Sequence, residues 1–173
     1  MKRIAVDFDG VISCLSKIVP QQINFWWWKI ESHLPIIFYL HHRFIRKPDL
    51  EIKKLLELLK KDRWQIIVIT GNYLRFQGFL EWWLKKYCFP YHQIFLRPES
   101  ESNIKNWKLK MVERLEVSVC LEDVQEFADF ISQHNKKVKV IHYQRGKKKW
   151  FNLWQGIKEL ASEQANSFKI YKI

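Results

Sequence analysis

Hydrophobic residues along this chain gather in short runs that alternate with longer segments of helical pattern. Five of the runs are rich in β-branched residues and lack a strict alternation with polar residues, which is typical of strands buried on both faces. They span Ile4–Phe8, Gln65–Thr70, Gln93–Leu96, Val117–Leu121 and Val138–His142. We therefore predict five strands of one largely buried sheet.

Helical patterns fill the intervals between these strands. Segment Asp49–Lys61 places its leucines along one apolar stripe and follows Pro48, a residue common where helices begin. The other predicted helices span Phe76–Tyr87, Lys105–Leu115, Gln125–His134 and Phe151–Gln164. Strands that alternate with helices predict an α/β fold whose parallel sheet carries helices on both faces.

One aromatic-rich segment, residues 14–47, does not fit this alternation. It contains three consecutive tryptophans at Trp26–Trp28, and charged residues and Pro35 interrupt it too often for a membrane span. Two interpretations follow: an inserted cap or flap over a site, or an amphipathic element that lies on a membrane or a partner. We predict a single domain over residues 1–173, with residues 14–47 as the insertion.

Charge and cysteine content limit the expected partners and the expected cellular compartment. The chain has 30 Lys and Arg against 18 acidic residues, a net charge of +12, which favours polyanionic partners such as nucleic acid, anionic lipid or phosphorylated metabolites. Its three cysteines, Cys14, Cys88 and Cys120, are scattered without a CxxC pair, which favours buried thiols in a reducing compartment. Because no signal-peptide pattern precedes the first strand, we expect a cytoplasmic protein.

Polar residues follow the predicted strands at their carboxyl ends. The first strand runs into Asp7–Gly10, the second ends in Thr70–Asn72, and the fourth ends in Glu122 and Asp123. Open α/β sheets bind their ligands at this edge. Two carboxylates as close in sequence as Asp7 and Asp9 repel each other unless a cation lies nearby, and Mg²⁺ prefers oxygen ligands. The pattern predicts a site for a metal ion and a phosphate.

The stretches DFDGVI, IIVITGN and CLEDV, with a lysine-bearing helix before the last of them, resemble in order and context the motifs of the haloacid dehalogenase-like phosphohydrolases. The resemblance covers Met1 to Tyr143 apart from the aromatic insertion. It implies a Rossmann-like sheet and a Mg²⁺-dependent phosphatase that works through an aspartyl-phosphate. Asp9 separates the chain from the dehalogenase branch of the family, which lacks this second acid.

The resemblance also implies roles for the acidic residues. Asp7 would be the nucleophile, and Asp9 would protonate the leaving oxygen and later activate water. Asp7, the backbone carbonyl of Asp9 and Asp123 would hold Mg²⁺. Glu122 or Glu126 would complete the outer shell around that ion.

The remaining motif residues would contact the substrate. Gly10 lets the chain turn closely around the phosphate. Thr70 would donate its hydroxyl to a phosphoryl oxygen, with the backbone of Gly71 and the side chain of Asn72 beside it. A lysine would neutralise developing charge. Three lysines crowd the start of one helix; Lys108 is the favoured one, Lys105 follows as a substrate-binding residue, and Lys110 remains open.

Substrate and partner are less constrained, because this fold serves many functions. The aromatic and basic insertion suits base stacking and phosphate attraction. The run FLRPESESNIKNWK also resembles, more loosely, the phosphatase domains of nucleic-acid end-healing enzymes. We expect nucleotides or nucleic-acid ends as substrates. The alternatives are a small phosphorylated metabolite, and a binding module that docks on a membrane or protein through the Trp-rich segment.

The insertion also carries two adjacent histidines, His41 and His42. Neighbouring side chains point apart, and no acidic residue lies near them in sequence. We therefore expect no metal-binding role for them.

Overall fold

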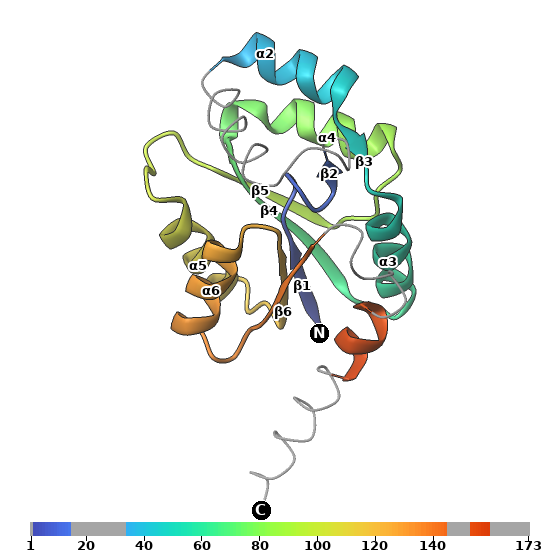
Figure 1. Ribbon diagram of the computed structural model, residues 1–173, viewed down its shortest axis with the longest axis vertical. Coiled ribbons are helices and arrows are strands. Elements are labelled where there is room, and N and C mark those ends of the chain that lie inside the picture. Colours follow the sequence, from blue (N-terminus) through green and yellow to red (C-terminus); the bar gives the residue numbers. More distant parts are fainter. Residues whose placement is uncertain (1, 15–33, 145–152, 160–173) are drawn as a thin grey trace, which may run out of the picture.

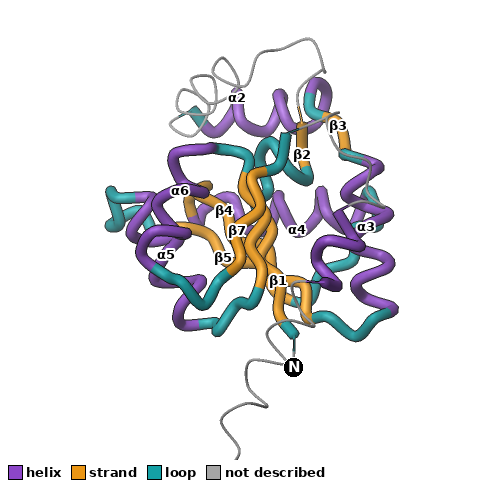
Figure 2. Tube along the Cα trace, turned by 60° about the horizontal axis from the view of Figure 1, so that its bottom comes forward, coloured by secondary structure: helices purple, strands orange, loops and turns teal. Residues whose placement is uncertain are grey.

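A five-stranded parallel sheet forms the centre of the molecule (Figures 1 and 2). The computed structural model describes residues 2–14, 34–144 and 153–159. The sheet has the order β5-β4-β1-β6-β7. Its strands are β1 (Arg3–Val6), β4 (Gln65–Tyr73), β5 (Gln93–Arg97), β6 (Val119–Glu122) and β7 (Lys139–His142). All five predicted strands are present, and the predicted α/β fold class is confirmed.

The carboxyl ends of two strands differ from the prediction by more than one residue. β1 stops at Val6, because the chain then turns tightly: the backbone N–H groups of Ile12 and Ser13 both donate to the carbonyl of Phe8. β4 continues past Thr70 to Tyr73, where it pairs again with Arg97 of β5 after a shift in register. Both departures lie at the carboxyl edge of the sheet, where the polar residues gather.

Both faces of the sheet are covered, which explains the continuous apolar runs. Helices α3 (Leu50–Lys61) and α4 (Gln77–Lys86) share one core cluster with Ile4 and Val6. Helices α5 (Ile104–Arg114) and α6 (Gln125–His134) share the other with Ala5. Successive residues of β1 thus point to opposite layers, as strand geometry requires.

Helix starts depend on local caps. Asp49 caps α3, since its carboxylate accepts hydrogen bonds from the backbone of Glu51 at 3.0 Å and Ile52 at 3.2 Å. Such a cap stabilises by about 1 kcal/mol. Pro48, which precedes the predicted helix, lies in the short strand β3 (Lys47–Pro48). Of the predicted closing helix, the described residues 153–159 are helical and the rest lies outside the described residues.

The described part of the insertion forms an outer layer beyond α4 (Figure 1). β2 (Ser13–Cys14) pairs antiparallel with β3, and between them lie α2 (Pro35–Leu40) and the π-helix η1 (His41–Ile45). The wide turn of η1 closes with the Arg46 N–H donating to the His41 carbonyl at 2.9 Å. After β4, the short helix η2 (Leu74–Phe76) leads into α4. Trp26–Trp28 lie outside the described residues.

Among the helices of the described ranges, none is both long enough and apolar enough to cross a membrane.

Candidate active site

Three strands bring their carboxyl ends together at one point. Val6 pairs with Val68 of β4 on one side and with Leu121 of β6 on the other. The N–H of Asp7 continues this ladder by donating to the Leu121 carbonyl at 3.0 Å. The residues that follow β1 and β6 therefore lie side by side, although they are far apart in sequence.

Three buried carboxylates meet at this edge. Asp7, Glu122 and Asp123 each place one oxygen within 4.8 Å of the others. The ammonium of Lys108, from α5, lies 3.1 Å from Asp7 Oδ1 and 2.5 Å from Glu122 Oε2. Asp7 is further held by the Phe8 N–H, which donates to its Oδ1 at 2.9 Å. We call Asp7, Glu122, Asp123 and Lys108 the acidic cluster.

Burial and mutual repulsion make it unfavourable to ionise all the carboxyl groups of the acidic cluster at once. Burial, reinforced by Glu122, raises the pKa of Asp7 well above its usual value, although Lys108 opposes the shift. Burial and Glu122 likewise raise the pKa of Asp123 to about 8. Burial would lower the pKa of Lys108, but the neighbouring Asp7 and Glu122 outweigh it and the pKa is raised. Ionising all three carboxylates needs more positive charge than one ammonium provides.

A divalent cation fits this donor set. Mg²⁺ binds carboxylate oxygens, and here three of them converge in a buried place where their mutual repulsion is strong. Glu122 is the closest partner of Lys108, which leaves Asp7 and Asp123 as the carboxylates best placed for an ion. The sequence predicted both of these, together with the backbone of Asp9.

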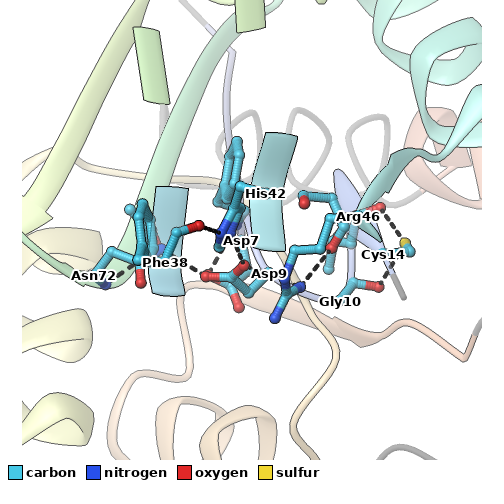
Figure 3. A network of polar contacts seen from close by, with 12 residues as sticks. Asp7, Asp9, Gly10, Cys14, Phe38, His42, Arg46 and Asn72 are labelled. Atoms are coloured by element: carbon cyan, nitrogen blue, oxygen red, sulfur yellow. Dashed lines mark hydrogen bonds and ion pairs between the residues drawn. The ribbon is translucent and has the colours of Figure 1, made fainter. Parts of the chain in front are cut away.

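Asp9 faces an opposite environment (Figure 3). Its Oδ1 lies 3.1 Å from Arg46 Nη1 and 3.1 Å from His42 Nε2, and its Oδ2 accepts a 2.5 Å hydrogen bond from Asn72 Nδ2. Burial alone would raise the pKa of Asp9, but Arg46 and the other donors outweigh it and lower the pKa to about 2. We call Asp9, His42, Arg46 and Asn72 the Asp9 clamp.

The contacts of His42 define where protons lie in the clamp. Its Nδ1 is 3.0 Å from the Phe38 carbonyl, which can only accept, so Nδ1 carries a proton. Its Nε2 faces the Asp9 carboxylate at 3.1 Å, and two lone pairs would repel there. The contact therefore contains one proton, bound to either His42 or Asp9.

Thr70 and Asn72 connect the clamp to the end of β4. The Thr70 hydroxyl oxygen accepts hydrogen bonds from Asn72 Nδ2 at 3.0 Å and from the Asn72 N–H at 3.3 Å. The hydroxyl proton of Thr70 remains available to donate elsewhere. The carbonyl of Gly71 accepts from Arg97 Nε at 3.0 Å, a contact that the motif analysis did not anticipate.

Gly10 makes room for Asp123. Its backbone has a φ of +86°, and a Cβ at this position would lie 1.7 Å from Asp123 Oδ2. Only glycine allows both the left-handed turn and this close approach. The sequence analysis linked Gly10 to a phosphate; the structure places the Asp123 carboxylate against it.

The three lysines of α5 have separate surroundings. Lys108 is buried in the acidic cluster, whereas Lys105 is partly exposed and pairs with Glu126 of α6. Lys110 is exposed and lies 3.8 Å from Glu101. Of the three, Lys108 is the one that the structure brings to Asp7.

Sequence reasoning missed the residues that surround Asp9. We expected no acidic neighbour for His42, but Asp9, which is distant in sequence, lies against it. Arg46 contributes to the basic character of the insertion, but no role was predicted for this residue from the sequence. Glu122 or Glu126 was expected in the outer shell of the ion, and the contact of Glu122 with Lys108 was not foreseen. No local pattern identified these contacts, because they depend on how the insertion and α5 pack on the sheet.

Comparisons with known proteins support the fold. No protein-family profile and no curated protein sequence matches the chain. Among solved structures, a chain of the Pnkp1/Rnl/Hen1 RNA repair complex superposes with a TM-score of 0.62 at 15% identity over 85% of this chain. The match covers 43% of that protein, so this chain spans less than half of its length.

Two further matches extend over nearly the whole length of the matched proteins. The HAD domain of the effector protein Lem4 from Legionella pneumophila, an inactive mutant, gives a TM-score of 0.56 at 13% identity over 96% of this chain and 97% of that one. The D,D-heptose 1,7-bisphosphate phosphatase from B. bronchiseptica gives a TM-score of 0.53 at 10% identity, and the match covers 92% of this chain and 99% of that one. The chain thus has the haloacid dehalogenase-like fold that its motifs predicted.

Proposed function

We propose that this protein is a Mg²⁺-dependent phosphomonoesterase in which Asp7 is the nucleophile. The observation that carries the proposal is the pairing of two carboxylates with opposite surroundings at one sheet edge. Asp7 lies in the acidic cluster, beside Lys108 at 3.1 Å, while Asp9 is held by three donors. Nucleophile and proton-transfer group are thereby kept apart.

The reaction follows from these positions. A carboxylate oxygen of Asp7 forms a bond to phosphorus, and the bond from phosphorus to the ester oxygen breaks. The leaving oxygen takes the proton held between Asp9 and His42. Water then gives a proton to Asp9 and attacks the phosphorus of the aspartyl-phosphate, which releases phosphate and regenerates Asp7. Lys108 and the Thr70 hydroxyl stabilise charge on the phosphoryl oxygens.

Asp7 and Asp123 would hold the cation, with the Asp9 carbonyl as the third protein ligand. Mg²⁺ would neutralise the acidic cluster and polarise the phosphoryl group. The likeness to the heptose bisphosphate phosphatase, a structure with magnesium and phosphate, supports this assignment. So does the pKa of Asp123, which burial and the charge of Glu122 raise, because a bound cation would favour the ionised carboxylate.

Hydrolysis of 4-nitrophenyl phosphate tests the proposal. Wild-type protein should require Mg²⁺ and lose activity in EDTA, and Asp7→Asn should reduce turnover at least about 10⁴-fold. Asp129→Asn, at an exposed position on α6, is the matched control and should keep full activity. Normal activity in Asp7→Asn would contradict the proposed nucleophile, and activity in EDTA would contradict the metal requirement.

The preferred substrates are phosphorylated nucleic-acid ends or nucleotides. Support comes from the net charge of +12 and from the likeness to a chain of an RNA repair complex. Release of phosphate from 3′- or 5′-phosphorylated oligonucleotides, with a rate that falls as salt increases, would bear this out. Turnover of sugar phosphates without turnover of any oligonucleotide would favour the alternative, a small phosphorylated metabolite. We also retain the prediction that the protein is cytoplasmic.

A further inference from the structure

The outward side of α2 and η1 is apolar. Ile36 is 74% exposed, Phe44 68% and Ile45 55%. Helices on the surface of a soluble domain normally turn polar residues outward. The inward side of the same segment is also apolar where Phe38 stacks on Phe76, with ring centroids 4.0 Å apart. Helix α2 is therefore apolar on its inward and its outward side.

The apolar area continues onto α4. The ring of Tyr39 lies 4.9 Å from that of Phe79, which in turn lies 5.3 Å from Trp82. Figure 1 shows α2 alongside α4, as these ring contacts require. We call this area the α2–α4 surface; its exposed members are Leu34, Ile36, Tyr39, Leu40, Phe44, Ile45 and Trp82. Contiguous exposed apolar area of this kind commonly marks an interaction site.

Each Arg or Lys of the described part of the insertion stands without an acidic residue in the same stretch of sequence. The stretch 34–48 contains no acidic residue. The guanidinium of Arg43 lies 5.4 Å from the centre of the Phe44 ring, and the ammonium of Lys86 lies 5.0 Å from that of Trp82. Long basic side chains placed beside exposed aromatic rings bury their stems and keep their charges at the rim.

This combination fits an anionic lipid surface better than a protein partner. The cores of protein interfaces are depleted in lysine, and a basic rim needs an acidic counterpart on the partner. An amphipathic element with aromatic and aliphatic side chains, flanked by Lys and Arg, lies in the bilayer interface and is attracted by anionic headgroups. We propose that the α2–α4 surface docks on the interface of an anionic lipid bilayer.

The docking surface and the site share one segment. The inward side of η1 supplies His42 to Asp9, while its outward side supplies Phe44 and Ile45 to the surface. Docking would therefore fix the orientation of the site relative to the bilayer. The lipid contact itself does not depend on the phosphatase chemistry, so each is tested separately.

Co-sedimentation of the full chain with vesicles tests the proposal. The protein should bind vesicles of phosphatidylcholine mixed with phosphatidylserine more tightly than vesicles of phosphatidylcholine alone, and added salt should weaken the binding. The double variant Ile36→Ser/Phe44→Ser should bind the anionic vesicles at least about tenfold more weakly than the wild type. Leu50→Ser, which removes an equally exposed leucine on α3, should bind as wild type.

Charge variants separate the two contributions. Arg43→Gln/Lys86→Gln should weaken binding to the anionic vesicles by about fivefold or more. Lys136→Gln/Lys137→Gln, which changes exposed lysines in the turn between α6 and β7, should not. The circular dichroism spectrum and thermal unfolding midpoint of each variant confirm folding without relying on the phosphatase activity, and none of these residues belongs to the acidic cluster or the Asp9 clamp.

Several results would overturn the proposal. Unchanged binding by Ile36→Ser/Phe44→Ser would assign the anchor elsewhere, including to residues 15–33. Equal binding to both vesicle types would remove the role of anionic lipid. If the wild type does not bind vesicles but self-associates on gel filtration, and the double variant does not self-associate, the surface is an interface between copies of the chain.

Discussion

Asp7 and Asp9 lie two residues apart on one turn, yet their surroundings are opposite. Asp7 is buried against two other acids and one lysine, and its pKa is raised. Asp9 is buried against an arginine, a histidine and an amide, and its pKa is lowered to about 2. The difference shows that position along the chain does not decide the charge state of a carboxylate; the segments that pack on it do.

Those segments come from different parts of the fold. The neighbours of Asp7 belong to α5 and to the end of β6, which are parts of the main α/β unit. Two of the neighbours of Asp9, His42 and Arg46, belong to the insertion. Under the proposed function the acidic cluster would bind a cation from solution, whereas the cations of the Asp9 clamp are side chains of the insertion. The four predictions below test this division.

Replacing Asp9 should have the largest effect. In Asp9→Asn the clamp loses its proton-transfer group, and turnover of 4-nitrophenyl phosphate should fall by about 10²- to 10⁴-fold. Because 4-nitrophenol leaves without help, the first step should persist and the aspartyl-phosphate should accumulate. Rapid mixing should therefore show a burst of nitrophenol close to one equivalent. Absence of a burst, with the same loss of turnover, would place Asp9 in the first step instead.

Replacing Lys108 should damage both activity and stability. Lys108→Met leaves the buried carboxylates Asp7 and Glu122 without their ammonium, so turnover should fall about 10²- to 10³-fold. The free energy of unfolding in urea should fall by about 3 kcal/mol. Lys105→Met, three residues earlier on the same helix, should change it by less than about 1 kcal/mol, because Lys105 pairs near the surface. Equal effects of the two variants would refute the assignment of Lys108.

Replacing His42 should reduce turnover by an amount that depends on the leaving group of the substrate. His42→Gln keeps an N–H that can donate to Asp9 but removes the imidazole that shares its proton. Turnover of an alkyl phosphate should fall about 10- to 100-fold, and turnover of 4-nitrophenyl phosphate should fall much less. Equal losses for both substrates would show that His42 only supports the structure.

The smallest effect concerns stability against pH in EDTA. The folded pKa of Asp123, about 8, lies above its unfolded value of about 4, so the stability it contributes is present at low pH and is lost as pH rises between these values. Asp9 acts in the opposite sense, but only below about pH 4. Unfolding free energy should therefore decrease from pH 4 to 8, by up to about 1.4 kcal/mol per unit for one group.

Two controls identify the source of that slope. Asp123→Asn should make it shallower, because one of the groups that takes up a proton is gone while Asp7, whose pKa is also raised, remains. Added Mg²⁺ should also flatten it in the wild type, since the ion favours the charged carboxylates. A slope that neither change makes shallower would show that other groups cause it.

The sequence predicted the parts of the site that belong to strand ends. Asp7 and Asp123 follow buried strands, and Thr70 lies near the carboxyl end of another. Because parallel strands end at one edge of the sheet, their placement at that edge could be inferred from the hydrophobic pattern and the order of the strands. Helix α6 was predicted with its observed ends, Gln125 to His134. These features depend on short-range patterns that strand and helix geometry impose.

The Asp9 clamp could not be predicted in the same way. His42 and Arg46 reach Asp9 only after the insertion folds back over the end of β1, a contact between residues 33 positions apart for His42. Their spacing and composition also suit an ordinary basic surface helix. The same limit applied to Gly10, whose need for space became visible only with the Asp123 carboxylate beside it.

The wide turn of η1 makes the length of the insertion matter. In a π-helix one more residue fits into the turn than in an α-helix, and here that turn lies between His41 and Arg46. Deleting a single residue from positions 43–45 would convert it to a regular turn and rotate Arg46 away from its place relative to His42. Relatives that shorten or lengthen this turn by one residue should therefore have lost the arginine or found another cation for Asp9.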